Sequence, residues 1–198
     1  MEDNDEQSLY PVDWSKKDLS LLAKYYIWEK FMSEWKNTEW SKSLKNKPVK
    51  YWIRDEIEEI IKEKHIDRNR FGEFSKLKYE EIIKRFYYTY MDYMKYPKIE
   101  LEYGWLRLRA SLNKESNIYV GGDWKRFLQQ LWDLVEEKEI KLYMILSLGW
   151  VYEGYAKEIF EVLGETDVLL DDFYIVSPNF DWMICYCDDG ESAALYRV

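Results

Sequence analysis

Histidine is almost missing from this sequence, because the 198 residues include a single one, His65. Catalytic mechanisms and metal sites that need two imidazole groups are therefore excluded. His65 follows a stretch with helical periodicity, and the C-terminus of a helix favours a positive charge. We interpret His65 as a residue that ends a helix rather than as a catalytic group.

Cysteine is scarce as well, with only Cys185 and Cys187. Two cysteines in a chain of this length make no disulfide framework, and a bridge between alternate residues of a strand would be strained. Two thiols without a third cysteine or a histidine also make a poor metal site. Nearby acidic residues oppose formation of a thiolate. We predict reduced thiols buried in a strand, and neither a metal nor any other cofactor.

Long apolar runs are absent, since no stretch reaches the 18 residues that a membrane helix requires. The first six residues, Met-Glu-Asp-Asn-Asp-Glu, lack the basic and apolar regions of a signal peptide. We therefore expect a cytoplasmic protein with no membrane contact. Only 8 glycines and 4 prolines occur and 47% of the residues are hydrophobic, which favours an ordered core over disorder.

Basic residues are missing from the C-terminal region. Residues 1–98 carry 20 basic and 19 acidic residues, whereas residues 99–198 carry 9 and 19, so the second half holds a net charge of −10. No lysine or arginine lies between Glu158 and Tyr196. Such a segment repels phosphate groups, which argues against nucleic acid and anionic lipid as partners. It would instead attract a basic protein.

Apolar residues recur at helical spacing in the first half of the chain. The pattern predicts helices over 16–36, 50–64 and 76–95, and Pro97 ends the last of them. Residues 1–14 are polar and acidic and are expected to be a frayed arm.

After Pro97 the apolar period changes from 3.6 to 2, which predicts one or two short strands over 99–111. Gly121-Gly122 is a turn, and Asp123 is a good N-cap for a helix over 124–138. The remaining pattern predicts a further helix and four strands, whose ranges are 154–163 for the helix and 140–148, 173–177, 181–187 and 193–197 for the strands.

These elements predict an α+β fold in which N-terminal amphipathic helices pack with a mainly antiparallel C-terminal sheet that carries two further helices. We expect a single domain over 1–198, with the arm at 1–14, a helical part at 15–97 and an α+β part at 98–198. The oligomeric state is left open.

No established catalytic sequence motif occurs. The chain contains no G-x-S-x-G, H-E-x-x-H, G-x-G-x-x-G or phosphate-binding loop. Several aspartates could hold a divalent cation, namely Asp167, Asp171, Asp172, Asp188 and Asp189. Metal-dependent nucleases also need lysine or arginine side chains that bind the phosphodiester, and this region has none. A metal-dependent hydrolase is thus the third of three functional hypotheses.

Aromatic residues make up 18% of the chain, and three of them gather at the end of a predicted buried strand. Tryptophan and tyrosine are frequent at interfaces, and loops at strand ends commonly carry function. We therefore predict a partner-binding surface formed by Trp150, Tyr152, Glu153, Tyr155, Asp188, Asp189 and Glu191. The other interpretation of the rings is that they close the edge of the core.

The C-terminal third contains the runs Tyr152-Glu153-Gly154, Phe173-Tyr174-Ile175-Val176-Ser177 and Asp181-Trp182. In these residues the chain resembles a group of small acidic α+β bacterial proteins of unknown function with a "YEG…FYIVS…DWL" ending. Some of that group are similar to the immunity proteins of polymorphic toxin systems. Relatives often continue with a histidine-containing stretch, but the matching place here reads Cys187-Asp188-Asp189-Gly190-Glu191. No role of those histidines is carried over.

The leading hypothesis is therefore a non-catalytic binding protein, which the resemblance suggests is an immunity protein that neutralises a basic toxin through an acidic, aromatic-rich face. The alternative is a regulatory module that binds a small molecule in an aromatic pocket.

Overall fold

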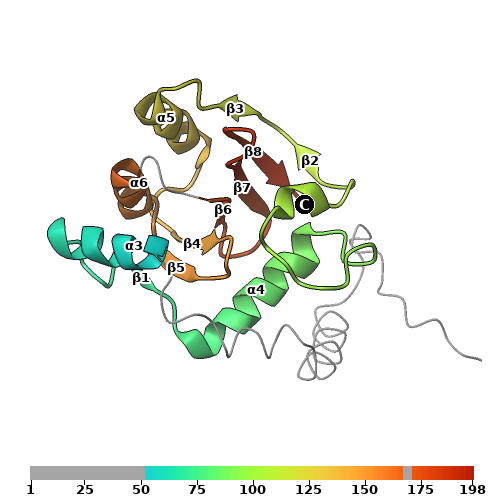
Figure 1. Ribbon diagram of the computed structural model, residues 1–198, viewed down its shortest axis with the longest axis horizontal. Coiled ribbons are helices and arrows are strands. Elements are labelled where there is room, and N and C mark those ends of the chain that lie inside the picture. The colour runs from blue at the N-terminus through green and yellow to red at the C-terminus, as the bar shows by residue number, and fades with distance from the viewer. Residues whose placement is uncertain (1–51, 167–170) are drawn as a thin grey trace, which may run out of the picture. The chain divides into compact units, whose positions relative to one another are not determined.

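The computed structural model describes residues 52–166 and 171–198 (Figure 1). The described residues belong to one compact unit, Pro48–Val198. The helix predicted over 16–36 and the arm at 1–14 lie outside the described residues. The prediction of one domain over 1–198 stays a prediction.

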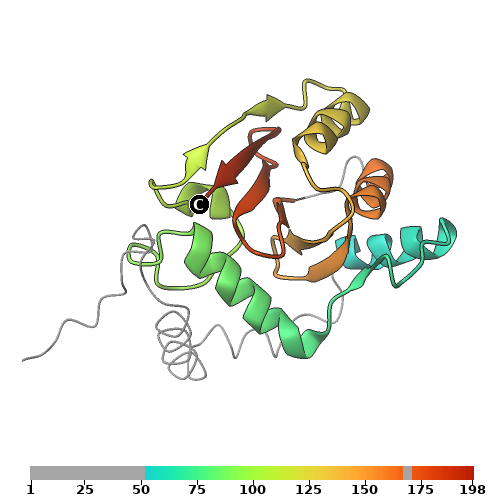
Figure 2. The same ribbon diagram turned by 180° about the vertical axis from the view of Figure 1, so that it is seen from behind.

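An eight-stranded sheet forms the centre of this unit, and every strand pairing in it is antiparallel (Figures 1 and 2). The strand order is β1-β5-β4-β6-β7-β8-β2, with β3 also paired to β8. The strands are β1 (Phe71–Glu73), β2 (Asn113–Lys114), β3 (Ile118–Tyr119), β4 (Lys141–Leu146), β5 (Val151–Tyr155), β6 (Phe173–Val176), β7 (Trp182–Cys187) and β8 (Ser192–Arg197). The predicted α+β class with an antiparallel sheet is confirmed.

Helices cover both faces of this sheet. They are α3 (Trp52–Glu63), α4 (Lys76–Tyr90), α5 (Trp124–Leu134) and α6 (Ala156–Glu165). On one face Phe127 of α5 packs against Tyr186 of β7, with ring centroids 5.7 Å apart. On the other face Phe86 of α4 packs against Tyr174 of β6 at 4.7 Å. Because both faces are covered, every residue of β6 and β7 is buried.

Helix α3 ends at Glu63, and His65 lies in the turn that follows it, close to the predicted helix end. His65 has a φ of 55°, in the left-handed region. The Ile66 N–H donates to the Ile61 carbonyl at 3.0 Å, and the His65 N–H donates to the Lys62 carbonyl at 3.3 Å. These are the two hydrogen bonds of a Schellman motif, and a position with positive φ usually carries glycine or asparagine. The role of His65 that the structure shows is therefore to adopt the left-handed conformation in the turn after α3.

The prediction of strands over 99–111 is wrong. This segment contains a 3₁₀ helix, η1 (Gly104–Arg107). Its β-type pairing is limited to one isolated bridge, between Met91 and Leu108. Helix α4 also ends at Tyr90, before the predicted residue 95, because Met91 turns to an extended conformation. The buried side chains of Ile99 and Leu101 explain the apolar pattern, because they pack on the core without strand pairing.

The other predicted elements are found with shifted ends. The Asp123 side chain accepts a hydrogen bond from the Arg126 N–H at 2.9 Å, which confirms it as an N-cap, although α5 ends four residues before the predicted residue 138. Residues 151–155, which were predicted to be a junction running into a helix, form strand β5. The described residues include no helix that is long and apolar enough to cross a membrane.

Candidate binding sites

Acidic residues that flank β6, β7 and β8 meet at one end of the sheet. Because β6 and β7 are antiparallel, the start of β6 lies beside the end of β7, and this places Asp172 next to Asp188. The end of β4 joins them, since the Ser147 N–H donates to the Asp172 carbonyl at 3.0 Å. We call the group formed by Asp171, Asp172, Asp188, Asp189 and Glu191 the acidic cluster.

Asp172 lies at the base of the acidic cluster with an exposed fraction of 6%. Its carboxylate accepts two backbone hydrogen bonds, from the Tyr103 N–H at 2.9 Å and from the Asp188 N–H at 3.1 Å. Burial raises the pKa of Asp172 to about 6, and the two N–H donors oppose that rise only in part. Burial and then the charge of Asp188 raise the pKa of Asp171 as well. The charged forms of Asp171 and Asp172 are therefore disfavoured in the folded protein.

The outer members of the cluster, Asp188, Asp189 and Glu191, are exposed to solvent. Within residues 52–166 and 171–198 none of them forms an ion pair, although ion pairs neutralise many glutamates elsewhere in the unit. The charges of Asp189 and then Glu102 raise the pKa of Tyr103, so the Tyr103 ring lies within the field of the cluster.

Glu191 occupies a strained position in the hairpin between β7 and β8. Its φ is 40°, in the left-handed region that glycine prefers. The Glu191 N–H closes the turn by donating to the Asp188 carbonyl at 2.9 Å. A non-glycine residue in this conformation costs about 1 kcal/mol. A charged side chain is thus held at the tip of the hairpin at a cost to stability.

Two large apolar side chains beside the acidic cluster are exposed. Tyr103 and Leu148 each expose 45% of their surface. Tyr103 is tied to the cluster through its N–H, and Leu148 follows Ser147, which bonds to Asp172. This end of the sheet therefore combines exposed apolar surface with carboxylates that form no ion pair with the residues that the structure describes.

The rings of the run 150–155 lie in the core. Trp150 is 5% exposed and packs edge-on against Tyr79, with centroids 5.8 Å apart. Tyr152 is fully buried and stacks on Phe71 of β1 at 5.2 Å. The predicted contact role of these two rings is revised for this reason: they are core residues, since β1 and the helices close over them.

Glu153 and Tyr155 are half-buried, and each already contacts a basic side chain of this chain. The Lys141 ammonium lies 3.3 Å from the Glu153 carboxylate, and the Arg70 guanidinium lies over the Tyr155 ring at 4.5 Å. The seven predicted contact residues are thus not one surface. The structure gathers only Asp188, Asp189 and Glu191 at an accessible place.

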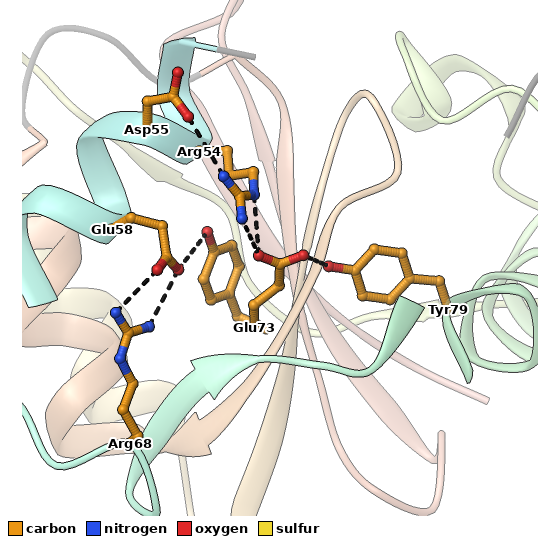
Figure 3. Close-up of polar contacts among 7 residues, drawn as sticks. Arg54, Asp55, Glu58, Arg68, Glu73 and Tyr79 are labelled. Carbon is orange, nitrogen blue, oxygen red and sulfur yellow. Dashed lines mark hydrogen bonds and ion pairs between the residues drawn. The ribbon is translucent and has the colours of Figure 1, made fainter. Parts of the chain in front are cut away.

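A polar network surrounds the buried end of β5, and Figure 3 shows its arrangement. The Arg54 guanidinium donates twice to the Glu73 carboxylate, at 2.7 and 2.9 Å, and the Tyr79 hydroxyl donates to the other oxygen of that carboxylate at 2.5 Å (Figure 3). The Arg68 guanidinium donates to both oxygens of the Glu58 carboxylate, at 2.9 and 3.2 Å. Each carboxylate is neutralised by an arginine, which identifies the network as a structural link between α3, β1 and α4.

A groove between α5 and α6 is the site that sequence reasoning missed. It has a volume of about 650 Å³. Its lining consists of Trp124, Lys125, Leu128, Gln129 and Trp132 from α5 and of Lys157, Phe160, Glu161, Gly164 and Glu165 from α6. The signal was present as rings and a leucine spaced by four residues on α5, but only the position of α6 shows that a groove lies beside them.

The two cysteines are free and buried. Burial raises the pKa of both thiols, so neither is disposed to form a thiolate. Among the described residues no group of three or more histidine, cysteine, aspartate or glutamate side chains is arranged to hold a metal ion.

The fold and its sites define a class, namely an α+β domain whose antiparallel sheet is enclosed by helices and ends in an acidic cluster. The chain belongs to the DUF6756 family, a family of unknown function whose model matches residues 49–198. No curated protein and no solved structure matches the chain. The match covers the unit that holds both candidate sites, and the description of the family names no activity.

Proposed function

We propose that this protein is a non-catalytic binding protein whose acidic cluster receives a basic protein partner. The observation that carries the proposal is the set of exposed carboxylates of Asp188, Asp189 and Glu191, which have no ion-pair partner among the described residues. Like charges that lie close together in sequence and in one turn repel one another and raise the energy of the free protein. A partner that brings lysine or arginine side chains removes this repulsion.

The local structure supports an interface rather than a merely solvated surface. The left-handed backbone at Glu191 places an acidic residue where glycine is preferred, and the exposed Tyr103 and Leu148 offer apolar contact beside the acidic cluster. Protein interfaces commonly join an apolar centre with a charged rim, and tyrosine is frequent in them. Charge accelerates encounter, and the apolar side chains prolong the complex.

The resemblance to immunity proteins gives the partner class that we propose, a basic protein toxin that the chain neutralises by covering it. Neutralisation by covering requires no catalytic group on this chain.

The test is capture of partners by the full chain, with and without the charges of the cluster. The variant Asp188→Asn/Asp189→Asn/Glu191→Gln removes three exposed charges. If each rim charge contributes about 0.5 kcal/mol, affinity for a basic partner falls roughly tenfold. The matched control, Glu59→Gln/Glu63→Gln/Glu81→Gln, removes the same charge from exposed positions on α3 and α4.

Partners are captured at about 50 mM salt and washed at about 500 mM, where screening is strong. We expect a basic protein that binds the wild type and the control, is released by the wash and is lost with the cluster variant. Equal retention by both variants would overturn the role of the cluster. Capture of acidic or neutral proteins alone would overturn the partner class.

A further inference from the structure

We propose that the groove between α5 and α6 is a second binding site, which takes a small planar aromatic ligand carrying one anionic group. This site lies apart from the acidic cluster, because its lining comes from α5 and α6 alone. Its volume of about 650 Å³ suits a drug-sized molecule.

The two helices run side by side and antiparallel (Figures 1 and 2). Trp132, late in α5, meets Phe160, early in α6, with the rings edge to face and their centroids 5.6 Å apart. Trp124, at the start of α5, donates its indole N–H to the Leu163 carbonyl, late in α6, at 2.8 Å. These two contacts bound the groove at both ends.

The rings that line the groove are held before any ligand arrives. Besides its bond to Leu163, Trp124 packs on Tyr186 of the sheet at 5.7 Å. Trp132 lies between Phe160 and the Lys138 ammonium, which is 5.0 Å from its ring. Fixed rings lose little side-chain entropy when a ligand binds, which is the main advantage of a preorganised site.

The space itself exists because position 164 of α6 is glycine. A Cβ built at Gly164 would lie 3.9 Å from the Leu128 side chain, its nearest neighbour, so a side chain here would enter the groove without meeting the core. Glycine in a helix interior is less favourable than alanine. The chain therefore keeps the groove open at a position where a larger residue would fit and would stabilise the helix.

The charges of the lining decide the class of ligand. Lys125 and Lys157 lie on opposite walls, and neither has an ion-pair partner in the described part of the chain. Of the two acidic lining residues, Glu165 pairs with Lys64 at 2.6 Å, and Glu161 has no ion pair among the described residues, so two lysines without ion pairs face one such carboxylate. Aromatic walls with unpaired lysines at the rim fit a planar ring that bears a carboxylate, sulfonate or phosphate.

The length of the groove favours a small molecule over a protein segment. Trp124 and Trp132 are eight residues apart, which corresponds to about 12 Å along the helix. A partner helix would need open ends, whereas both ends here are bounded by contacts between α5 and α6.

The probe is 1-naphthaleneacetate, titrated into the full chain by calorimetry, with 1-naphthaleneacetamide as its neutral counterpart. A ligand of this size at about 0.3 kcal/mol per heavy atom gives a Kd on the order of 1 mM, so the titration extends to about 5 mM. We expect saturable binding of the carboxylate, and binding of the amide that is weaker by roughly threefold to tenfold, as expected for contacts with two exposed lysines.

Three variants test the residues. Gly164→Leu fills the groove and should abolish binding. Lys125→Gln/Lys157→Gln should weaken carboxylate binding by roughly threefold to tenfold and leave amide binding unchanged. The matched control, Lys62→Gln/Lys114→Gln, removes two exposed lysines elsewhere and should leave both ligands unaffected.

Gly164→Ala guards against a folding artefact, because it adds a single methyl group and should bind more weakly than wild type while melting at a higher temperature. Absence of saturable binding, or binding that Gly164→Leu does not change, would overturn the site. Equal binding of the carboxylate and the amide would overturn the anionic class.

Discussion

Replacement of Asp172 with asparagine should change the way in which the stability of the protein depends on pH. The carboxyl group is buried at the base of the acidic cluster, and its pKa rises from the ordinary 3.8 to about 6 because burial disfavours the charged form. Between about pH 3.8 and about pH 6 the Asp172 carboxyl binds more protons in the folded state than in the unfolded state. Stability from this group is therefore fully present below pH 3.8 and is lost as the pH rises through about 6.

The size of the effect follows from the shift. About two pKa units at about 1.4 kcal/mol each amount to roughly 3 kcal/mol of free energy of unfolding, as an upper bound. Asparagine cannot ionise, but its amide nitrogen cannot accept a hydrogen bond, so one of the two N–H groups that face the oxygens of Asp172 loses its acceptor at every pH. Relative to wild type, Asp172→Asn should therefore be less stable at low pH and should gain about 2 kcal/mol of free energy of unfolding as the pH rises from about 4 to about 7.

The assay is urea unfolding, monitored by tryptophan fluorescence, from about pH 5 to about pH 8. Roughly half of the total pH-dependent change in the free energy of unfolding falls within this range. The quantity of interest is the difference between variant and wild type, because any pH-independent cost of the amide cancels in its slope. Asp133→Asn, at an exposed aspartate on α5, controls for loss of one charge. Parallel stability curves for Asp172→Asn and wild type would refute the reasoning.

Three further substitutions should act in different directions. Gly154→Ala should destabilise the unit by about 2 kcal/mol or more, since its Cβ would lie 2.5 Å from the Phe71 ring and 2.7 Å from the Arg70 carbonyl, and thermal unfolding would show it. Gly164→Ala should stabilise by about 1 kcal/mol, because a helical glycine is replaced where space exists; a lower melting temperature would contradict the account of the groove. Glu191→Gly should also stabilise, by about 1 kcal/mol, by relieving the left-handed backbone, yet should weaken binding of a basic partner; denaturant unfolding and the capture assay measure the two effects separately.

Much of the fold could be predicted because the apolar pattern reports which faces are buried. Helix α3, the N-cap at Asp123 and the strands β4, β6, β7 and β8 followed from period and turn chemistry. The pattern misled at 99–111, where alternating burial arises from a 3₁₀ helix and irregular chain that pack on the core. The short strands β1, β2 and β3 carry too few residues to show any period.

The candidate sites divide in the same way. Clustering of charge is local in sequence, so the exposed acids at 188, 189 and 191 could be found from the residues alone. The burial of Trp150 and Tyr152 could not, because it depends on β1 pairing with β5 from a segment about 80 residues earlier. The groove required two helices separated by a strand pair to lie side by side.

The sequence by itself determined the α+β class, the positions of most helices and strands and the acidic character of the C-terminal half, since these depend on local periodicity and composition. Only the tertiary structure decided which carboxylates are neutralised and which remain unpaired, because ion pairs such as that of Arg70 with Glu158 join residues far apart in the chain. It also decided that the rings of 150–155 belong to the core and that those of α5 line a groove. Burial is a property of what packs on a residue, and that neighbour is rarely adjacent in sequence.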